Sequence, residues 1–149
     1  MKTTFTIILV LLFTFKIYNY IKDKNRLEFT KMEYNQNDIT NEQIKTYKFL
    51  SDMYRDPYFP NNCVDMGKNL LIKLCLDIEE KQPKTLEDLY ILTHETTDRF
   101  NDLEEVFYEN GSEIETVARE AICEDFRQIA TAYGFENADS EELVATRDW

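Results

Sequence analysis

The sequence predicts an all-α protein: a compact antiparallel bundle of about four helices plus a short C-terminal helix, preceded by an N-terminal hydrophobic helix. Three observations predict this class. Apolar residues make up 43% of the 149 residues and recur at helical spacing through most of the chain. Glycine and proline number only 3 each, too few for the many turns of a β-sandwich or barrel. Capping signals separate the periodic segments by short loops, which favours antiparallel neighbours.

The N-terminal region is predicted to be a membrane anchor. Residues 5–21 are largely apolar, with a strictly apolar stretch of about 11 residues. That length suits the hydrophobic part of a signal peptide, but Lys16, Ile17, Tyr18 and Tyr20 occupy the zone where small residues would mark a cleavage site. We therefore favour an uncleaved single-pass anchor. Export after signal cleavage and a cytoplasmic protein are the alternatives.

The chain divides into three parts with different charge. Residues 1–21 are the hydrophobic signal-anchor or signal peptide, residues 22–39 form a polar linker without helical periodicity, and residues 40–149 form an acidic helical domain. Residues 1–26 sum to +4, whereas residues 27–149 carry −16. Because such a domain repels phosphate backbones, we expect no nucleic-acid binding, and the expected partner is a protein of basic charge.

The first two helices of the domain follow from a capping box and an apolar face. Thr40, with Gln43 three residues later, predicts the start of a helix that ends before the prolines of residues 55–62. Apolar residues at helical spacing predict the second helix over about 63–81.

A second capping box opens the third helix, which is the one with unusual chemistry. Thr85 is the predicted cap, with Asp88 three residues later, and Asn110 and Gly111 form the stop signal. The inner face of this helix is polar in its middle turn, where a helix that only packs would carry leucine or alanine.

The fourth helix and the C-terminus complete the bundle. Ser112, with Glu115, predicts the start of the fourth helix, and Gly134 is its predicted left-handed C-cap. A last short helix starts at Asp139 or the next residue. The terminal Trp149 is predicted to dock onto the bundle, with presentation to a partner as the alternative.

Four separated stretches of the chain carry a family resemblance. They are THETTDRFNDLEE (93–105), ENGSEIETVARE (109–120), AYGFE (132–136) and ATRDW (145–149). In this order they resemble DUF5713, a small bacterial family of unknown function, over roughly residues 48–149. The resemblance implies a unit of this size and no particular activity. Members of that family are short and soluble, so the hydrophobic start of this chain departs from the pattern.

His94 is the only histidine and the centre of the candidate site. His94, Asp98 and Asn101 or Asp102 share one face of the predicted third helix. With Glu95, the string H-E-T-T-D is similar to the H-E-x-x-H motif of zinc proteases, with the second ligand changed to a carboxylate. The candidate catalytic residues are His94, Glu95, Asp98 and Asp102, and the candidate metal ligands are His94 and Asp98. The competing interpretation is a structural histidine in the core or at its rim, hydrogen-bonded to a carboxylate of the fourth helix.

Other polar groups are assigned structural roles. Asp125 lies close to the apolar row of the fourth helix, so it is predicted to be partly buried and to need a donor, Arg99 or His94. The three cysteines are Cys63, predicted at a loop start, and Cys75 and Cys123, predicted to be buried free thiols. No cofactor is predicted, because P-loop, G-x-G-x-x-G, G-x-S-x-G and EF-hand patterns are absent from the sequence.

Two functional hypotheses follow. The preferred one is a non-enzymatic, membrane-tethered interaction or regulatory module whose acidic surface binds a basic protein. The alternative is a metal-binding or hydrolytic enzyme that uses the His94/Asp98 cluster. The enzyme requires a concave pocket around His94 with converging polar groups, whereas the module tolerates a filled core there.

Overall fold

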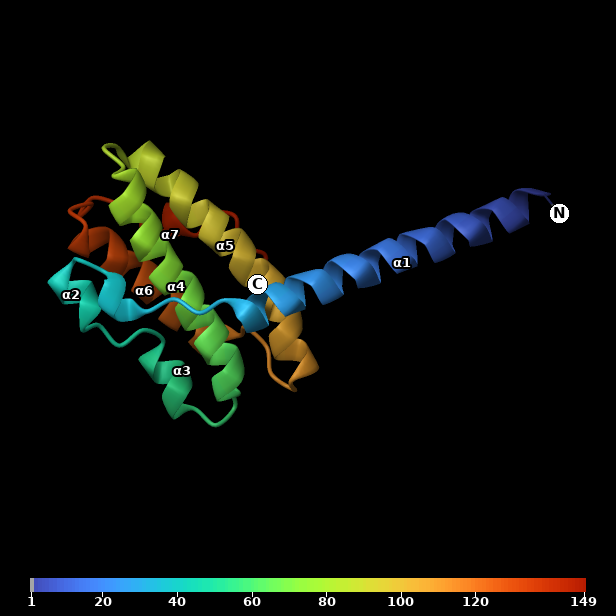
Figure 1. Cartoon of the computed structure of the whole chain (residues 1–149), viewed down its shortest axis with the longest axis horizontal. Coiled ribbons are helices and arrows are strands. Elements are labelled where there is room, and N and C mark those ends of the chain that lie inside the picture. The colour runs from blue at the N-terminus through green and yellow to red at the C-terminus, as the bar shows by residue number, and fades with distance from the viewer. Residues whose placement is uncertain (1) are drawn as a thin grey trace. The chain divides into compact units, whose positions relative to one another are not determined.

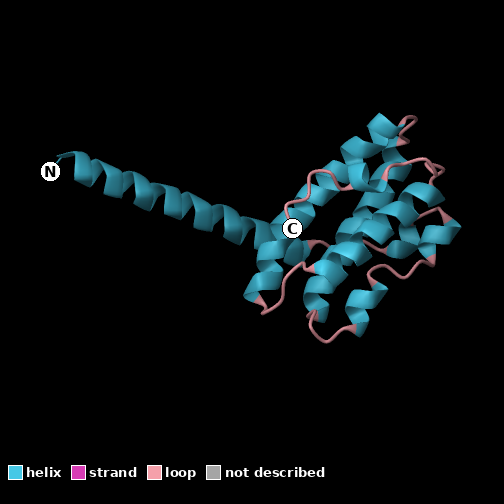
Figure 2. Cartoon of the chain, turned by 180° about the vertical axis from the view of Figure 1, so that it is seen from behind, coloured by secondary structure: helices cyan, strands magenta, loops and turns pink. Residues whose placement is uncertain are grey.

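A computed structural model describes residues 2–149, and the side chains of residues 7, 8, 10–24 and 26–149 (Figure 1). The chain separates into two compact units, Met1–Lys31 and Met32–Trp149. All regular structure in the described residues is helical, so the predicted all-α class is confirmed (Figure 2).

The first unit is one helix, α1 (Lys2–Lys31). Residues 22–31 are therefore helical, where the sequence predicted an irregular linker. Among the described residues, no helix is both long enough and apolar enough to span a membrane. The predicted single-pass anchor over residues 5–21 is thus not supported. Residues 1–6 and 9, on which part of that prediction rests, lie outside those whose side chains the structure describes.

The second unit holds the remaining elements and begins earlier than the predicted domain boundary at residue 40. Residues 32–39 belong to it: Ile39 is fully buried, and the backbone N–H of Tyr34 donates to Asn69 Oδ1 at 3.2 Å. Its helices are η1 (Gln36–Asp38), α2 (Glu42–Lys45), α3 (Ser51–Arg55), α4 (Asn61–Lys81), α5 (Leu86–Glu109), α6 (Thr116–Ala132) and α7 (Ser140–Leu143).

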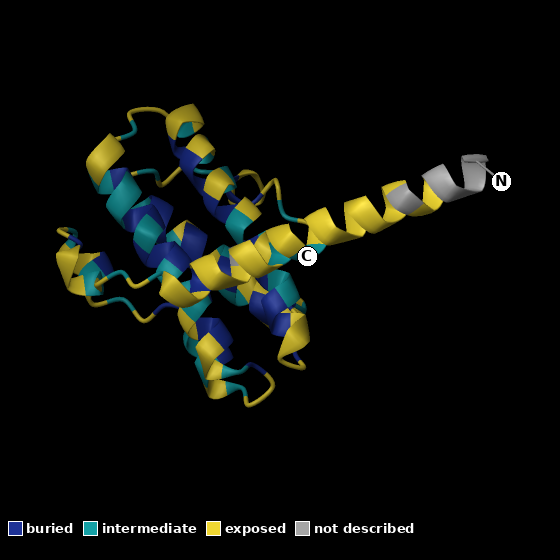
Figure 3. Cartoon of the chain, turned by 45° about the vertical axis from the view of Figure 1, so that its right-hand side comes forward, coloured by how far each residue is buried: buried dark blue, intermediate teal, exposed yellow. Residues whose placement is uncertain are grey.

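The core of this unit lies between α4, α5 and α6. Helices α4 and α5 pack along their lengths, α3 and α2 lie against α6, and α7 contacts both α5 and α6. Figure 3 shows the buried residues on the inner faces of these helices. Gly67 on α4 leaves room for the side chains of Leu50 and Phe100, because an added Cβ would lie 3.1 Å from both Leu50 Cδ1 and Phe100 Cε1. The central side chains are Leu70, Leu71, Leu74, Phe100, Leu103, Phe107, Ile122, Phe126 and Ile129.

The single helix predicted from Thr40 is wrong: this stretch forms two short helices, α2 and α3. Asn41 caps α2 with its side chain, and residues 46–50 interrupt the helical path. Leu50 adopts a left-handed backbone with φ 51°, which is costly for a residue other than glycine. Tertiary hydrogen bonds to this segment, described below, outweigh its local helical pattern.

The capping predictions for the longer helices have mixed outcomes. The Thr85–Asp88 capping box of α5 is present, and Gly134 has the expected positive φ, 89°, at the end of α6. The capping box at Ser112 is wrong, because Glu115 caps α6. The N–H of Ser112 donates to Phe107 O at 3.0 Å, so this residue closes the end of α5 instead.

Candidate functional site

His94 lies in the middle of α5 and holds the C-terminal segment of the chain. Its Nε2 lies 2.7 Å from the backbone oxygen of Glu142, and its ring stacks on Tyr90 with centroids 6.1 Å apart. The hydroxyl of Thr146 donates to the His94 backbone oxygen at 3.3 Å. His94 therefore has structural contacts, but they go to the C-terminal segment and not to a carboxylate of the fourth helix, the partner that the structural interpretation predicted.

Two of the other candidate residues on α5, Glu95 and Asp102, each lie beside a cation. Glu95 lies 3.6 Å from Lys81 Nζ, and Asp102 accepts from Arg99 Nη1 at 3.0 Å. Asp98 is exposed. Within the described residues, no group of three or more His, Cys, Asp or Glu side chains is placed to hold a metal ion. Metal binding by His94 and Asp98 stays a prediction from sequence.

The polar middle turn of α5 is explained by its own helix. Thr93, Thr96 and Thr97 are buried, and the hydroxyls of the last two donate to backbone oxygens four residues earlier, at 3.0 Å and 2.8 Å. Because these hydroxyls are satisfied locally, the polarity needs no ligand.

Asp125 is buried, as predicted, but the predicted donors are wrong. Its Oδ1 accepts from the Tyr47 hydroxyl at 2.8 Å, and its Oδ2 accepts from the backbone N–H of Leu50 at 2.7 Å. Burial raises the pKa of Asp125 to about 7, although these two hydrogen bonds act in the opposite direction. The carboxyl group fixes the turn that separates α2 from α3, including its left-handed residue.

Glu79 is a second anchor of the same region. Its carboxylate accepts from the backbone N–H groups of Thr40 and Asn41 and from the Tyr133 hydroxyl, at 2.8–3.0 Å. Burial acts to raise its pKa, but these hydrogen bonds outweigh burial and lower it. Glu79 therefore ties the start of α2 to α4 and to the end of α6.

The three cysteines are free thiols in protected surroundings. Cys75 is buried as predicted, Cys123 is only half-buried, and Cys63 is buried inside α4 rather than at a loop start. Burial raises the pKa of all three thiols. They are protonated near neutral pH, which disfavours a nucleophilic role.

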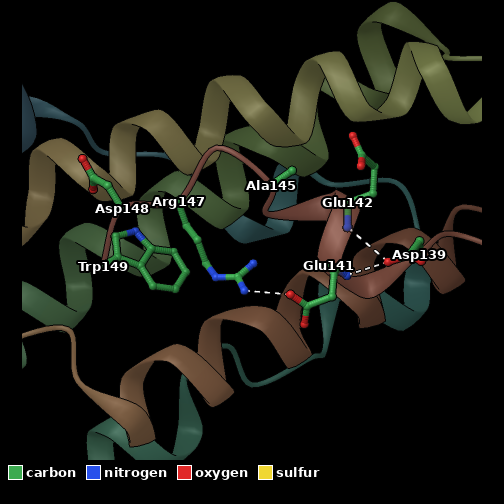
Figure 4. A pocket seen from close by; sticks show the side chains of 7 residues that line it. All are labelled: Asp139, Glu141, Glu142, Ala145, Arg147, Asp148 and Trp149. Atoms are coloured by element: carbon green, nitrogen blue, oxygen red, sulfur yellow. Dashed lines mark hydrogen bonds and ion pairs between the residues drawn. The ribbon is translucent and has the colours of Figure 1, made fainter.

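The C-terminal residues form a depression of about 580 Å³, called here the acidic depression. Figure 4 shows the side chains that surround it. Arg147 is the only cationic group among them, and it donates to Glu141 at 2.7 Å. The lining residues are Asp139, Glu141, Glu142, Ala145, Arg147, Asp148 and Trp149.

Side chains of α5 hold the acidic depression in place. Asn101 donates to Thr146 O at 2.9 Å and accepts from the N–H of Asp148 at 3.2 Å. The Tyr90 hydroxyl accepts from the N–H of Asp139 at 3.0 Å. Only 9% of the surface of Trp149 is exposed. The predicted docking of this residue onto the bundle is therefore confirmed.

A second depression, called here the basic groove, is lined by cationic residues, and the sequence analysis did not predict it. This basic groove has a volume of about 740 Å³ and no carboxylate among its lining residues. Its cations come from the α2–α3 segment and from α4, so no continuous motif in the sequence signals them. The lining residues are Gln36, Lys45, Thr46, Tyr47, Lys48, Phe49, Ser51, Tyr54, Arg55 and Lys68.

A family comparison covers most of the chain. A family model described as "Family of unknown function (DUF5713)" matches residues 43–149. The chain belongs to this family. The matched residues of this DUF5713 member include α5, α6, the acidic depression and most of the basic groove. The match confirms the resemblance found in the sequence. No curated protein and no solved structure matches the chain.

Proposed function

We propose that residues 32–149 form a non-catalytic interaction module that binds a cationic region of a partner protein through the acidic depression. The observation that carries this proposal is the convergence of four carboxylate side chains around one depression with a single cation. These carboxylates come from Asp139, Glu141, Glu142 and Asp148. All four residues are exposed, and His94 holds the backbone oxygen of Glu142.

The charge of the whole unit supports a cationic partner. Residues 32–149 contain 27 acidic and eleven basic residues. Such an excess attracts cationic partners at long range and raises association rates at low salt. The interaction is therefore expected to weaken as ionic strength rises, because screening shortens the range of the attraction.

Charge reversal at the acidic depression tests this proposal. The full-length protein and a Glu142→Lys/Asp148→Lys variant are used to capture partners from cells by cross-linking. A matched control, Glu33→Lys/Glu80→Lys, reverses two exposed acidic residues outside the depression. We expect one dominant partner that the first variant loses and the control retains. Equal loss in both variants, or retention in the first, contradicts the proposal.

We also propose that α1 brings this module to a membrane. From residue 7 to residue 21, exposed apolar side chains lie on every side of the helix, and such a helix needs lipid or protein to cover it. They are Ile7, Ile8, Val10, Leu11, Leu12, Phe13, Phe15, Ile17, Tyr18, Tyr20 and Ile21.

Cell fractionation and N-terminal sequencing test the membrane proposal. We expect the full-length chain to sediment with membranes and to keep its N-terminus. A mature protein that starts after residue 21 would instead indicate export after cleavage. A soluble protein with an intact N-terminus would rule out the tether.

A further inference from the structure

The basic groove is unusual for its surroundings. Four of the eleven lysines and arginines in residues 32–149 line it: Lys45, Lys48, Arg55 and Lys68. The same residues 32–149 contain 27 aspartates and glutamates, and none of them lines the groove. Because so many residues of this unit are acidic, ten lining residues drawn at random would be expected to include about two carboxylates.

Two of these cations are available to a ligand. Arg55 lies 2.6 Å from Asp52, and Lys45 lies 4.0 Å from Glu42 at the edge of the groove. For Lys48 and Lys68, the described residues provide no carboxylate within 4.0 Å of the ammonium group. Two ammonium groups, one from the α2–α3 segment and one from α4, thus line one groove with no ion pair among the described residues.

The wall of the groove is fixed before any ligand arrives. Gln36 Nε2 donates to the backbone oxygens of Ile44 and Tyr47, both at 2.8 Å. Asp125 binds the Tyr47 hydroxyl and the N–H of the left-handed Leu50 from the buried side. Strained backbone of this kind persists only where the surroundings hold it, and it concentrates at ligand sites.

Aromatic side chains supply the apolar part of the groove. Tyr47 and Phe49 contact each other edge to face, with ring centroids 5.1 Å apart. Tyr54 lies on α3, and its hydroxyl donates to Asp65 at 2.5 Å, which holds the ring in place. A ligand in this groove therefore meets aromatic surface beside ammonium groups.

We propose that the basic groove binds a small phosphorylated compound with an aromatic or apolar body. A phosphate group carries the double charge that Lys48 and Lys68 can match together, and lysine binds phosphate as a point charge. The aromatic lining accepts the body of the ligand, and the volume lies in the range of small-molecule pockets. A long polyanion is disfavoured, because beyond the groove it would meet the field of a unit with charge −16.

Binding of ATP without Mg²⁺ to the full-length protein, measured by calorimetry at low salt, tests this proposal. Pyrophosphate provides the phosphate charge alone, and adenosine provides the ring alone. We expect ATP to bind more tightly than either. We expect Lys48→Glu and Lys68→Glu each to weaken ATP binding by roughly tenfold. Lys84→Glu is the matched control, because Lys84 is exposed and lies outside the groove.

Four results would overturn the proposal. These are no ATP binding at millimolar concentration, pyrophosphate binding as tight as ATP binding, equal weakening by Lys84→Glu, and binding to phosphatidylglycerol vesicles but not to ATP. Circular dichroism checks the fold of each variant, because Lys48 and Lys84 are exposed but Lys68 is half-buried.

Discussion

The acidic depression and the basic groove are two surfaces of one unit that are built in different ways. The acidic depression comes from one continuous stretch, residues 139–149, which α5 holds mainly through hydrogen bonds to its backbone. The basic groove comes from three separate segments, and a buried carboxyl group, Asp125, fixes its wall. Loss of an exposed anchor leaves its partners to water, whereas loss of a buried anchor leaves its partners buried and unsatisfied. The two surfaces should therefore differ in how they respond to mutation.

The largest effect is expected at the wall of the basic groove. Asp125→Ala removes the acceptor of the Leu50 N–H and leaves that buried donor without a partner. We expect a loss of about 2–4 kcal/mol in the free energy of unfolding, measured by urea denaturation. Asp125→Asn keeps an acceptor of similar shape and should lose less. A change below about 0.5 kcal/mol for the alanine variant would show that this anchor is dispensable.

The corresponding change at the acidic depression is smaller. Trp149→Ala empties a largely buried site at the edge of the unit, and we expect a loss of about 2–3 kcal/mol. In the described structure the buried indole Nε1 has no hydrogen-bond partner. Trp149→Phe removes that group and keeps an aromatic ring, so it should lie within about 1 kcal/mol of the native protein. Similar losses for both variants in thermal unfolding would contradict the importance of ring packing.

A pH series separates the buried anchor from the exposed ones. The pKa of Asp125 is about 7 in the folded protein, above its usual value near 4 in an unfolded chain. The folded state then binds more protons between about pH 4 and pH 7, so stability falls as pH rises through this window. Relative to Asp125→Asn, the native protein should lose roughly 2–3 kcal/mol between pH 4.5 and pH 7.5, as a pKa difference of about three implies. A difference that does not change with pH would refute the raised pKa.

The smallest effect is expected for single anchors of the acidic depression. His94→Ala removes one hydrogen bond and a ring contact, and we expect a loss of about 1 kcal/mol. Asp98→Ala, at the next turn of the same helix, should change stability by less than about 0.5 kcal/mol. Capture of the partner should persist in the Asp98 variant. Loss of function in both variants without unfolding would revive the enzyme hypothesis.

The long helices were predictable because their signals are local. The capping box at Thr85, the apolar face of α4 and the glycine cap at Gly134 each depend on residues within a few positions of one another. The helix predicted from Thr40 failed for the opposite reason. Its interruption depends on Gln36, 11 residues before Tyr47, and on Asp125, 75 residues after Leu50, and both lie outside the local helical pattern.

The candidate sites show the same division. The polar turn of α5 attracted a catalytic interpretation, but local hydrogen bonds and the docked C-terminus account for the contacts of His94, Thr96 and Thr97. The burial of Asp125 followed from helical periodicity, whereas its partners did not. The basic groove had no signal in the sequence, because Lys68 joins Lys45 and Lys48 only through folding.

The sequence by itself determined the helical class, the boundaries of the best-capped helix, the family and the strongly acidic character of residues 32–149. Periodicity, capping and composition are properties of neighbouring residues, so no tertiary information is needed to read them. Only the tertiary structure decided where the turn before α3 lies, which donors satisfy Asp125 and which lysines gather in one groove. Those features depend on contacts between distant segments, and such contacts leave no pattern along the chain.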